Sequence, residues 1–236
     1  SLNAGSLWGR PFYILREAWN ILNAIAEGKI ESGDEKKLNA LKGETMAVIA
    51  LCQFDLTRCF GYPYTKDNGA SLGAPLIDHL VGTYENPSRS TVAQAYDFII
   101  ETLEEAVTLM SEEKNNGRMN KYAARALLAR VYLYHNDNRK AFDMAEQLIK
   151  DVDASGSYAL YPHEKYVAAW SVETKFGSES FFEIANSVDD TPGRDSWGYL
   201  LNWYGYQKGF VTQKYAEQML ADPGDVRGQL LEENKY

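Results

Sequence analysis

The sequence predicts an all-α protein in which tetratricopeptide-like helical hairpins stack into an α-α superhelix. Apolar residues recur at helical spacing through most of the N-terminal two thirds, and glycine or proline breaks separate these runs. The stretch over 117–161 adds the order helix, short turn, helix that is typical of such a repeat. We therefore expect a helical scaffold over 1–155 and a more irregular, ligand-side region over 156–236.

Two helices are predicted at the start of the chain. Apolar spacing indicates one helix over 13–26 and a longer one over 35–60, which Gly61 and Pro63 end. The linker over 27–34 is short and polar, so these helices should pack antiparallel.

Cys52 and Cys59 are the only cysteines, and both fall on the second of these helices. Seven residues of helix place them on one face, roughly 10 Å apart along the axis. That separation is too large for a disulfide. We expect small buried apolar side chains rather than redox centres or metal ligands.

A long segment over 62–90 follows, rich in glycine, proline, asparagine and aspartate. A connection of this length is uncommon in a helical protein and often carries function. Thr91 and Gln94 then form a capping box that begins the next helix, and the Asn-Asn-Gly sequence over 115–117 breaks it.

The central hairpin has the strongest local pattern. An alanine- and leucine-rich helix is predicted over 121–134, a polar turn over 135–138, and a second helix over 139–150. Small residues at two signature positions let the paired helices approach closely. We expect Ala129 to be buried against the second helix. The four signature positions are Leu128, Ala129, Tyr132 and Ala141.

The pattern changes after residue 150. Short apolar runs over 158–161 and 180–185 fit either one small strand pair or plain extended chain. One last helix is predicted over 212–220, where a threonine begins it and Asp222-Pro223 ends it.

Composition excludes several classes of function. The formal net charge of −9 disfavours nucleic acid and an anionic membrane surface as partners. No window reaches the roughly 18 apolar residues of a membrane span. The three histidines, His79, His135 and His163, lie in no metal-ligand spacing, and no nucleophile elbow or phosphate loop is present. We expect no catalytic residue, no metal site and no cofactor, and we interpret Asp189-Asp190 as solvated turn acids rather than half of a glycosidase pair.

The aromatic segment over 194–210 is the strongest candidate for ligand binding. Aromatic residues alternate there with glycines, so much of it cannot form a regular helix. Rigid aromatic faces pack on the apolar faces of sugar rings, and planar polar groups bond the hydroxyls. The alternative is that these aromatics only pack the segment onto the body of the protein. The candidate ligand-binding residues are Trp197, Tyr199, Trp203, Tyr206, Arg194 and Asn202.

The order of motifs along most of the chain carries a family resemblance. Gly117-Arg118 precedes the alanine-rich helix, LLARVYLY spans 127–134, and SGSYAL spans 155–160. Other matches in order are LKGE at 41–44, FGYP at 60–63, APLI at 74–77, RSTVAQAY at 89–96, IIETLEEA at 99–106, SESFF at 178–182 and DPGDVR at 222–227. This order resembles the SusD/RagB family, the nutrient-binding outer-membrane lipoproteins of glycan-foraging bacteria.

The resemblance implies a function and its partners. It implies non-catalytic binding of oligosaccharide or polysaccharide at the outer-membrane surface, with delivery to a TonB-dependent, SusC-like transporter. Attachment would use a lipid anchor that is not present in this chain. The helical scaffold would meet the transporter, and the aromatic loops would meet the sugar. By residue type, Trp8 with Arg10 and Asn3 in an N-terminal loop resembles a further sugar-binding set of the family.

Two departures from the family pattern remain. The usual arginine-alanine pair of the second helix is replaced by Ile49-Ala50. Family members are also about twice this long, so we interpret the chain as a truncated part of the family fold or an unusually short member. A helical-repeat adaptor that binds protein or peptide is the alternative function, and a glycoside hydrolase ranks third.

Overall fold

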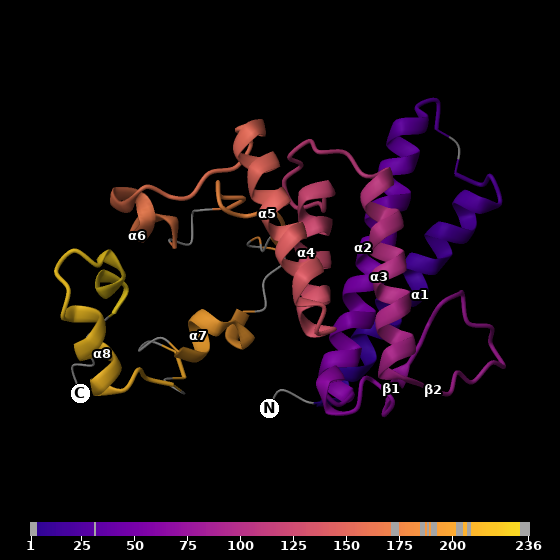
Figure 1. Cartoon of the computed structure of the whole chain (residues 1–236), viewed down its shortest axis with the longest axis horizontal. Coiled ribbons are helices and arrows are strands. Elements are labelled where there is room, and N and C mark those ends of the chain that lie inside the picture. The colour runs from indigo at the N-terminus through magenta and orange to yellow at the C-terminus, as the bar shows by residue number, and fades with distance from the viewer. Residues whose placement is uncertain are drawn as a thin grey trace. The chain divides into compact units, whose positions relative to one another are not determined.

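The computed structural model consists mainly of helices (Figure 1). It describes residues 4–30, 32–170, 175–184, 187, 189, 193–201, 205–206 and 209–231, without the side chains of Ala4 and Trp197. The chain divides into two compact units, Ser1–Ser157 and Tyr158–Tyr236. Each unit is described by itself.

The first unit is a series of helices in which each packs on the next along the chain (Figure 1). These helices are α1 (Ala4–Ala26), α2 (Glu35–Phe60), α3 (Val92–Leu109), α4 (Lys121–Tyr134) and α5 (Asn138–Ser155). Contacts between neighbours in sequence are those of stacked helical hairpins. The predicted all-α class is confirmed.

Side chains from the preceding turn fix the start of each later helix. The Asp34 carboxylate accepts the N–H groups of Lys36 and Lys37 at the start of α2. The predicted capping box of α3 is present: Thr91 accepts the Gln94 N–H, and the Gln94 side chain accepts the Thr91 N–H. These bonds satisfy N–H groups that have no partner within the helix.

The packing of α2 on α3 depends on a glycine. A Cβ built on Gly43 would lie 2.7 Å from Met110 Cγ and 2.9 Å from the Ala106 carbonyl oxygen. No larger residue fits between the two helices without a shift of backbone. Gly43 lies in the LKGE motif, so that motif marks a helix-packing contact.

The core of the first unit joins α1, α2 and the long segment. Leu15, Ala18, Ile49, Cys52, Leu56, Ala74 and Ile77 form one buried cluster. Cys52 is buried as predicted, but the expectation for Cys59 is wrong, because Cys59 is exposed. In the last turns of α2 the contacts with this core are made by Leu56 and Phe60.

The hairpin of α4 and α5 also requires one correction. Leu128, Tyr132 and Ala141 are buried as signature positions should be. Ala129 is only half-buried, so the prediction that it is buried against the second helix is wrong. Ala124, one and a half turns earlier, is the fully buried small residue of α4.

The structure contains one strand pair among the described residues, and it lies in the long segment. Strand β1 (Leu72–Pro75) pairs antiparallel with β2 (Arg89–Thr91), with Leu72 opposite Thr91. The runs after residue 150 form no strand where they are described. The first run bonds to the residues just before the second, through Ala159 N–H to Ser178 O at 3.0 Å and Tyr161 N–H to the Glu179 carboxylate, and the Tyr158 and Phe181 rings pack together.

The second unit contains short helices joined by irregular chain. These are α6 (Tyr166–Ala169), α7 (Trp197–Leu201) and α8 (Gln213–Leu220), with single 3-10 turns η2 (His163–Lys165), η3 (Gly193–Asp195) and η4 (Val226–Leu230). The predicted last helix is confirmed, and Thr212 caps it by accepting the Tyr215 N–H. Over the residues that are described, no helix is both long and apolar enough to cross a membrane.

Candidate functional site

The predicted aromatic segment brings Tyr199 and Tyr206 together. Their rings meet edge to face, with centroids 5.2 Å apart and planes at 78°. The Tyr206 N–H also donates to the Tyr199 carbonyl at 2.9 Å. A Cβ on Gly205 would lie 1.8 Å from that carbonyl oxygen, so only glycine permits this close return of the chain. Tyr206 stays 46% exposed and presents an aromatic surface.

The other residues of this candidate site are only partly described. Arg194 lies in η3 with its side chain exposed. Trp203 and Asn202 lie outside the described residues, as does the side chain of Trp197. The backbone of Trp197 begins the short helix α7, so the described part of the segment includes a regular turn, Trp197–Leu201, among its glycines.

Trp8 lies on α1 and not in a loop, so the expectation of an N-terminal loop is wrong. The helix begins at Ala4 although Gly9 and Pro11 lie inside it. The Trp8 ring packs against Phe12 at 5.0 Å and edge-on against Phe60 at 4.7 Å. This tertiary contact explains why the helix extends past residues that disfavour it. Trp8 is 37% exposed, and its contact with a ligand stays a prediction.

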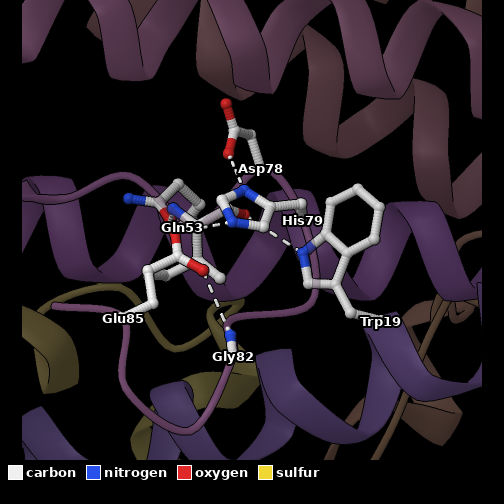
Figure 2. Close-up of polar contacts among 7 residues, drawn as sticks. Trp19, Gln53, Asp78, His79, Gly82 and Glu85 are labelled. Carbon is white, nitrogen blue, oxygen red and sulfur yellow. Dashed lines mark hydrogen bonds and ion pairs between the residues drawn. The ribbon is translucent and has the colours of Figure 1, made fainter. Parts of the chain in front are cut away.

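The long segment is held firmly on the first two helices (Figure 2). Gln53 on α2 is fully buried, and its amide donates to the Pro75 carbonyl at 3.1 Å and accepts the Ile77 N–H at 3.3 Å. The Trp19 indole N–H on α1 donates to the Ile77 carbonyl at 3.1 Å. Three backbone groups of the segment, the Pro75 carbonyl and the N–H and carbonyl of Ile77, therefore find side-chain partners in one place, which fixes the path of the chain after β1.

His79 closes the next part of the segment (Figure 2). Its Nδ1 lies 2.6 Å from the Asp78 carboxylate, and its Nε2 lies 2.8 Å from Glu85. Glu85 also accepts the Gly82 N–H at 3.1 Å. The hydrogen bond to Asp78, and then that to Glu85, raises the pKa of His79. This histidine ties a loop, a role that sequence spacing did not indicate.

A cavity of about 880 Å³ lies elsewhere in the first unit, between the start of α2, the end of α3 and the connection to α4. Its lining includes Lys36, Lys37, Met110 and Met119 but no aromatic residue. Within it Glu44 is already bonded to the Arg118 guanidinium at 2.8 Å and to the Met119 N–H at 3.0 Å. Among the described residues, none of the predicted ligand residues lines this cavity, and its lining offers no aromatic ring on which a sugar could stack.

Metal chemistry has no support in the described part of the chain. No group of three or more histidine, cysteine, aspartate or glutamate side chains is placed there to hold an ion. Burial raises the pKa of the Cys52 thiol to about 11, which keeps it protonated and unreactive.

The stacked helical hairpins of the first unit place the chain in the class of α-helical-repeat proteins. Comparison with known proteins narrows this class. A SusD-like family model, described as "Starch-binding associating with outer membrane", matches residues 3–133. The chain belongs to the SusD-like family, and the resemblance drawn from its motifs is confirmed. None of the curated proteins matches it.

Solved structures show the same relationship. A SusD superfamily protein from Bacteroides vulgatus ATCC 8482 is 96% identical with a TM-score of 0.94, over 100% of this chain and 53% of that one. A SusD superfamily protein from Bacteroides thetaiotaomicron VPI-5482 is 34% identical with a TM-score of 0.85, over 97% and 50%. A laminarin binding SusD-like protein, at 23% identity, TM-score 0.60 and coverage of 82% and 40%, shows the fold alone. The chain spans about half the length of the first of these relatives.

Proposed function

We propose that this chain binds oligosaccharide or polysaccharide without catalysis at the bacterial outer-membrane surface. The observation that carries the proposal is the Tyr199–Tyr206 pair, held edge to face by a turn that only Gly205 permits, in a chain of the SusD-like family. The description of the family as starch-binding and outer-membrane-associated supports it. One relative of the same fold is described as laminarin binding, which makes laminarihexaose a suitable probe.

The ligand surface would be built around the exposed face of Tyr206. Aromatic rings supply contact area at low entropic cost, and polar groups beside them bond the hydroxyls. Arg194 would supply donors, and Trp197, Trp203 and Asn202 of the same segment would extend the surface. Trp8 would act as a separate contact from the first unit.

Removing single aromatic side chains tests the site. In calorimetric titrations with maltohexaose and laminarihexaose, Tyr206→Ala, Trp197→Ala and Trp203→Ala are compared with the wild-type chain. Tyr84→Ala is the matched control, because Tyr84 is 96% exposed in the other unit. At least one site variant should lose about ten-fold in affinity, equivalent to about 1.4 kcal/mol, while the control keeps wild-type binding. If all three site variants show native circular dichroism and bind with wild-type affinity, these aromatics have only a packing role.

The partner of this protein would be a TonB-dependent, SusC-like transporter of the outer membrane, and a lipid anchor would hold this protein at the same membrane. The outer faces of the stacked helices would supply the contact, as extended helical-repeat surfaces do. Affinity purification of the tagged full-length protein from outer-membrane extracts should retain the transporter. A preparation in which the transporter is consistently absent would argue against this partner.

Catalysis is not part of the proposed function. The purified chain should release no reducing sugar above background from starch or laminarin. Release that a chelator abolishes would point to a metal-dependent hydrolase instead.

A further inference from the structure

Two exposed aromatic rings and an exposed arginine lie on three elements of the second unit that are far apart in sequence. Trp170 follows α6, Tyr215 lies on α8, and Arg227 lies on η4. Both α6 and α8 pack on η4. Trp170 is 66% exposed and Tyr215 is 50% exposed. Two large rings are thus exposed to solvent on segments next to the same 3-10 turn, η4.

Tyr166 connects these groups. Its ring meets the Trp170 ring at a centroid distance of 6.1 Å and an angle of 64°. The phenols of Tyr166 and Tyr215 both lie close enough to Arg227 to raise its pKa, after the larger effect of Asp225. The guanidinium is therefore a common neighbour of aromatic side chains from both helices.

Asp225 holds the Arg227 guanidinium in a fixed plane. Arg227 Nε lies 2.9 Å from Asp225 Oδ1, and Nη2 lies 2.6 Å from Oδ2. The Arg227 N–H also donates to the same carboxylate at 3.0 Å. This side-on pairing uses the Nε and Nη2 donors and leaves the Nη1 donors directed away from the carboxylate. The Arg227 side chain is 62% exposed, so those donors can reach a ligand.

The backbone of the turn that carries Asp225 is also held by hydrogen bonds. The Asp225 N–H donates to the Asp222 carbonyl at 3.0 Å. The His163 Nε2–H of η2 donates to the neighbouring Gly224 carbonyl at 2.8 Å. The guanidinium plane is thus set before any ligand arrives, which lowers the entropic cost of binding.

We propose that Trp170, Tyr215 and Arg227 form a second sugar-binding surface that takes a neutral oligosaccharide. The rings pack on the apolar face of a sugar ring, and the free edge of the guanidinium donates to a hydroxyl. Asp225 neutralises the charge of Arg227, and the net charge of −9 repels acidic glycans. Neutral hexoses fit both conditions, whereas uronate chains do not. This inference rests on the proposed glycan-binding function.

Calorimetry on the 236-residue chain tests the surface. The probes are maltohexaose, laminarihexaose, xylohexaose, mannohexaose and an acidic galacturonan hexamer. The variants are Trp170→Ala, Tyr215→Ala and Arg227→Lys, with Tyr84→Ala as the control. Each of the first two should weaken binding of the preferred neutral probe about ten-fold. Arg227→Lys keeps the charge and loses the planar fork, so it should weaken binding by a smaller factor.

A second measurement keeps the test decisive if a variant folds poorly. In wild-type protein, the Trp170 indole N–H resonance, assigned by its loss in Trp170→Phe, should shift on addition of the preferred neutral probe. The galacturonan hexamer should leave it unmoved.

The outcomes separate this inference from the function on which it rests. If the wild type binds none of the neutral probes, the proposed function fails and this surface fails with it. If the wild type binds but Trp170→Ala and Tyr215→Ala bind equally well, or the indole resonance does not move, only the second surface is overturned. Preferred binding of the galacturonan hexamer would overturn the assignment to neutral glycans.

Discussion

The amide of Gln53 bonds to the carbonyl of Pro75 at 3.1 Å and joins the middle of α2 to the end of β1. The same amide accepts the Ile77 N–H, so one buried side chain satisfies two backbone groups of the long segment. Such a side chain is costly to replace, because its partners are left buried without bonds.

We predict that Gln53→Leu lowers the free energy of unfolding by about 1–3 kcal/mol for each group left unpaired. Chemical denaturation monitored by circular dichroism measures this change. Gln147→Leu, on the exposed face of α5, is the control and should change stability by less than about 0.5 kcal/mol. Equal stability of the two variants would show that Gln53 does not hold the segment.

Gly43 gives a second prediction. Gly43→Ala places a methyl group 2.7 Å from Met110 Cγ and 2.9 Å from the Ala106 carbonyl, so α2 and α3 must separate. The expected loss is about 1–3 kcal/mol. Gly33→Ala is the control, since a Cβ there meets nothing within 4 Å. A melting temperature that does not fall in Gly43→Ala would contradict the close packing of these helices.

The two alanines of α4 make a matched pair. Ala124 is fully buried and Ala129 is half-buried. Ala124→Leu should therefore overpack the hairpin and cost about 1–3 kcal/mol, and Ala129→Leu should cost less. Thermal melts of the two variants check the order. A larger loss of stability in Ala129→Leu than in Ala124→Leu would support the original expectation that Ala129 is buried against α5.

His79 predicts a pH dependence with a definite sign. Its pKa is raised in the folded protein by Asp78 and Glu85, above the ordinary histidine value of about 6.5. The raised value means that its contribution to stability is complete below about pH 6.5 and is lost as the pH rises through the folded-state pKa. Desolvation opposes this shift, but the two acidic neighbours outweigh it.

The stability difference between wild type and His79→Gln should shrink as the pH rises above about 6.5. An NMR titration should place the pKa of His79 above 6.5, and Glu85→Gln should lower it. High salt should reduce the effect, since the His79 side chain is half-exposed. A His79 pKa at or below the ordinary value would refute the bridge.

Local chemistry explains what the sequence predicted well. Thr91 and Gln94 predict the start of α3 because a capping box involves only neighbours along the chain. The density of aromatics and glycines singled out the segment that contains Tyr199 and Tyr206, and contact of these residues with a ligand stays a prediction.

Long-range contacts explain what the sequence did not predict. The extra turns of α1 depend on the contact of Trp8 with Phe60, across more than fifty residues. The strand pair depends on Leu72 meeting Thr91, which no alternation of apolar residues indicates. The periodicity of apolar residues also carries no information on buried polar side chains, so it did not indicate that the Gln53 amide is buried.

The second aromatic surface was missed for the same reason. Tyr166 and Tyr215 lie on separate elements, and only the fold brings both near Arg227. The DPGDVR motif contains that arginine, but the motif alone does not show which rings surround it.

Calorimetric titration of the chain with neutral hexasaccharides tests the central claim of glycan binding most directly. The account predicts saturable binding of at least one of maltohexaose and laminarihexaose, weakened about ten-fold by removal of at least one ring among Tyr206, Trp197 and Trp203 and unchanged by Tyr84→Ala. A folded wild-type chain that binds neither sugar would contradict it.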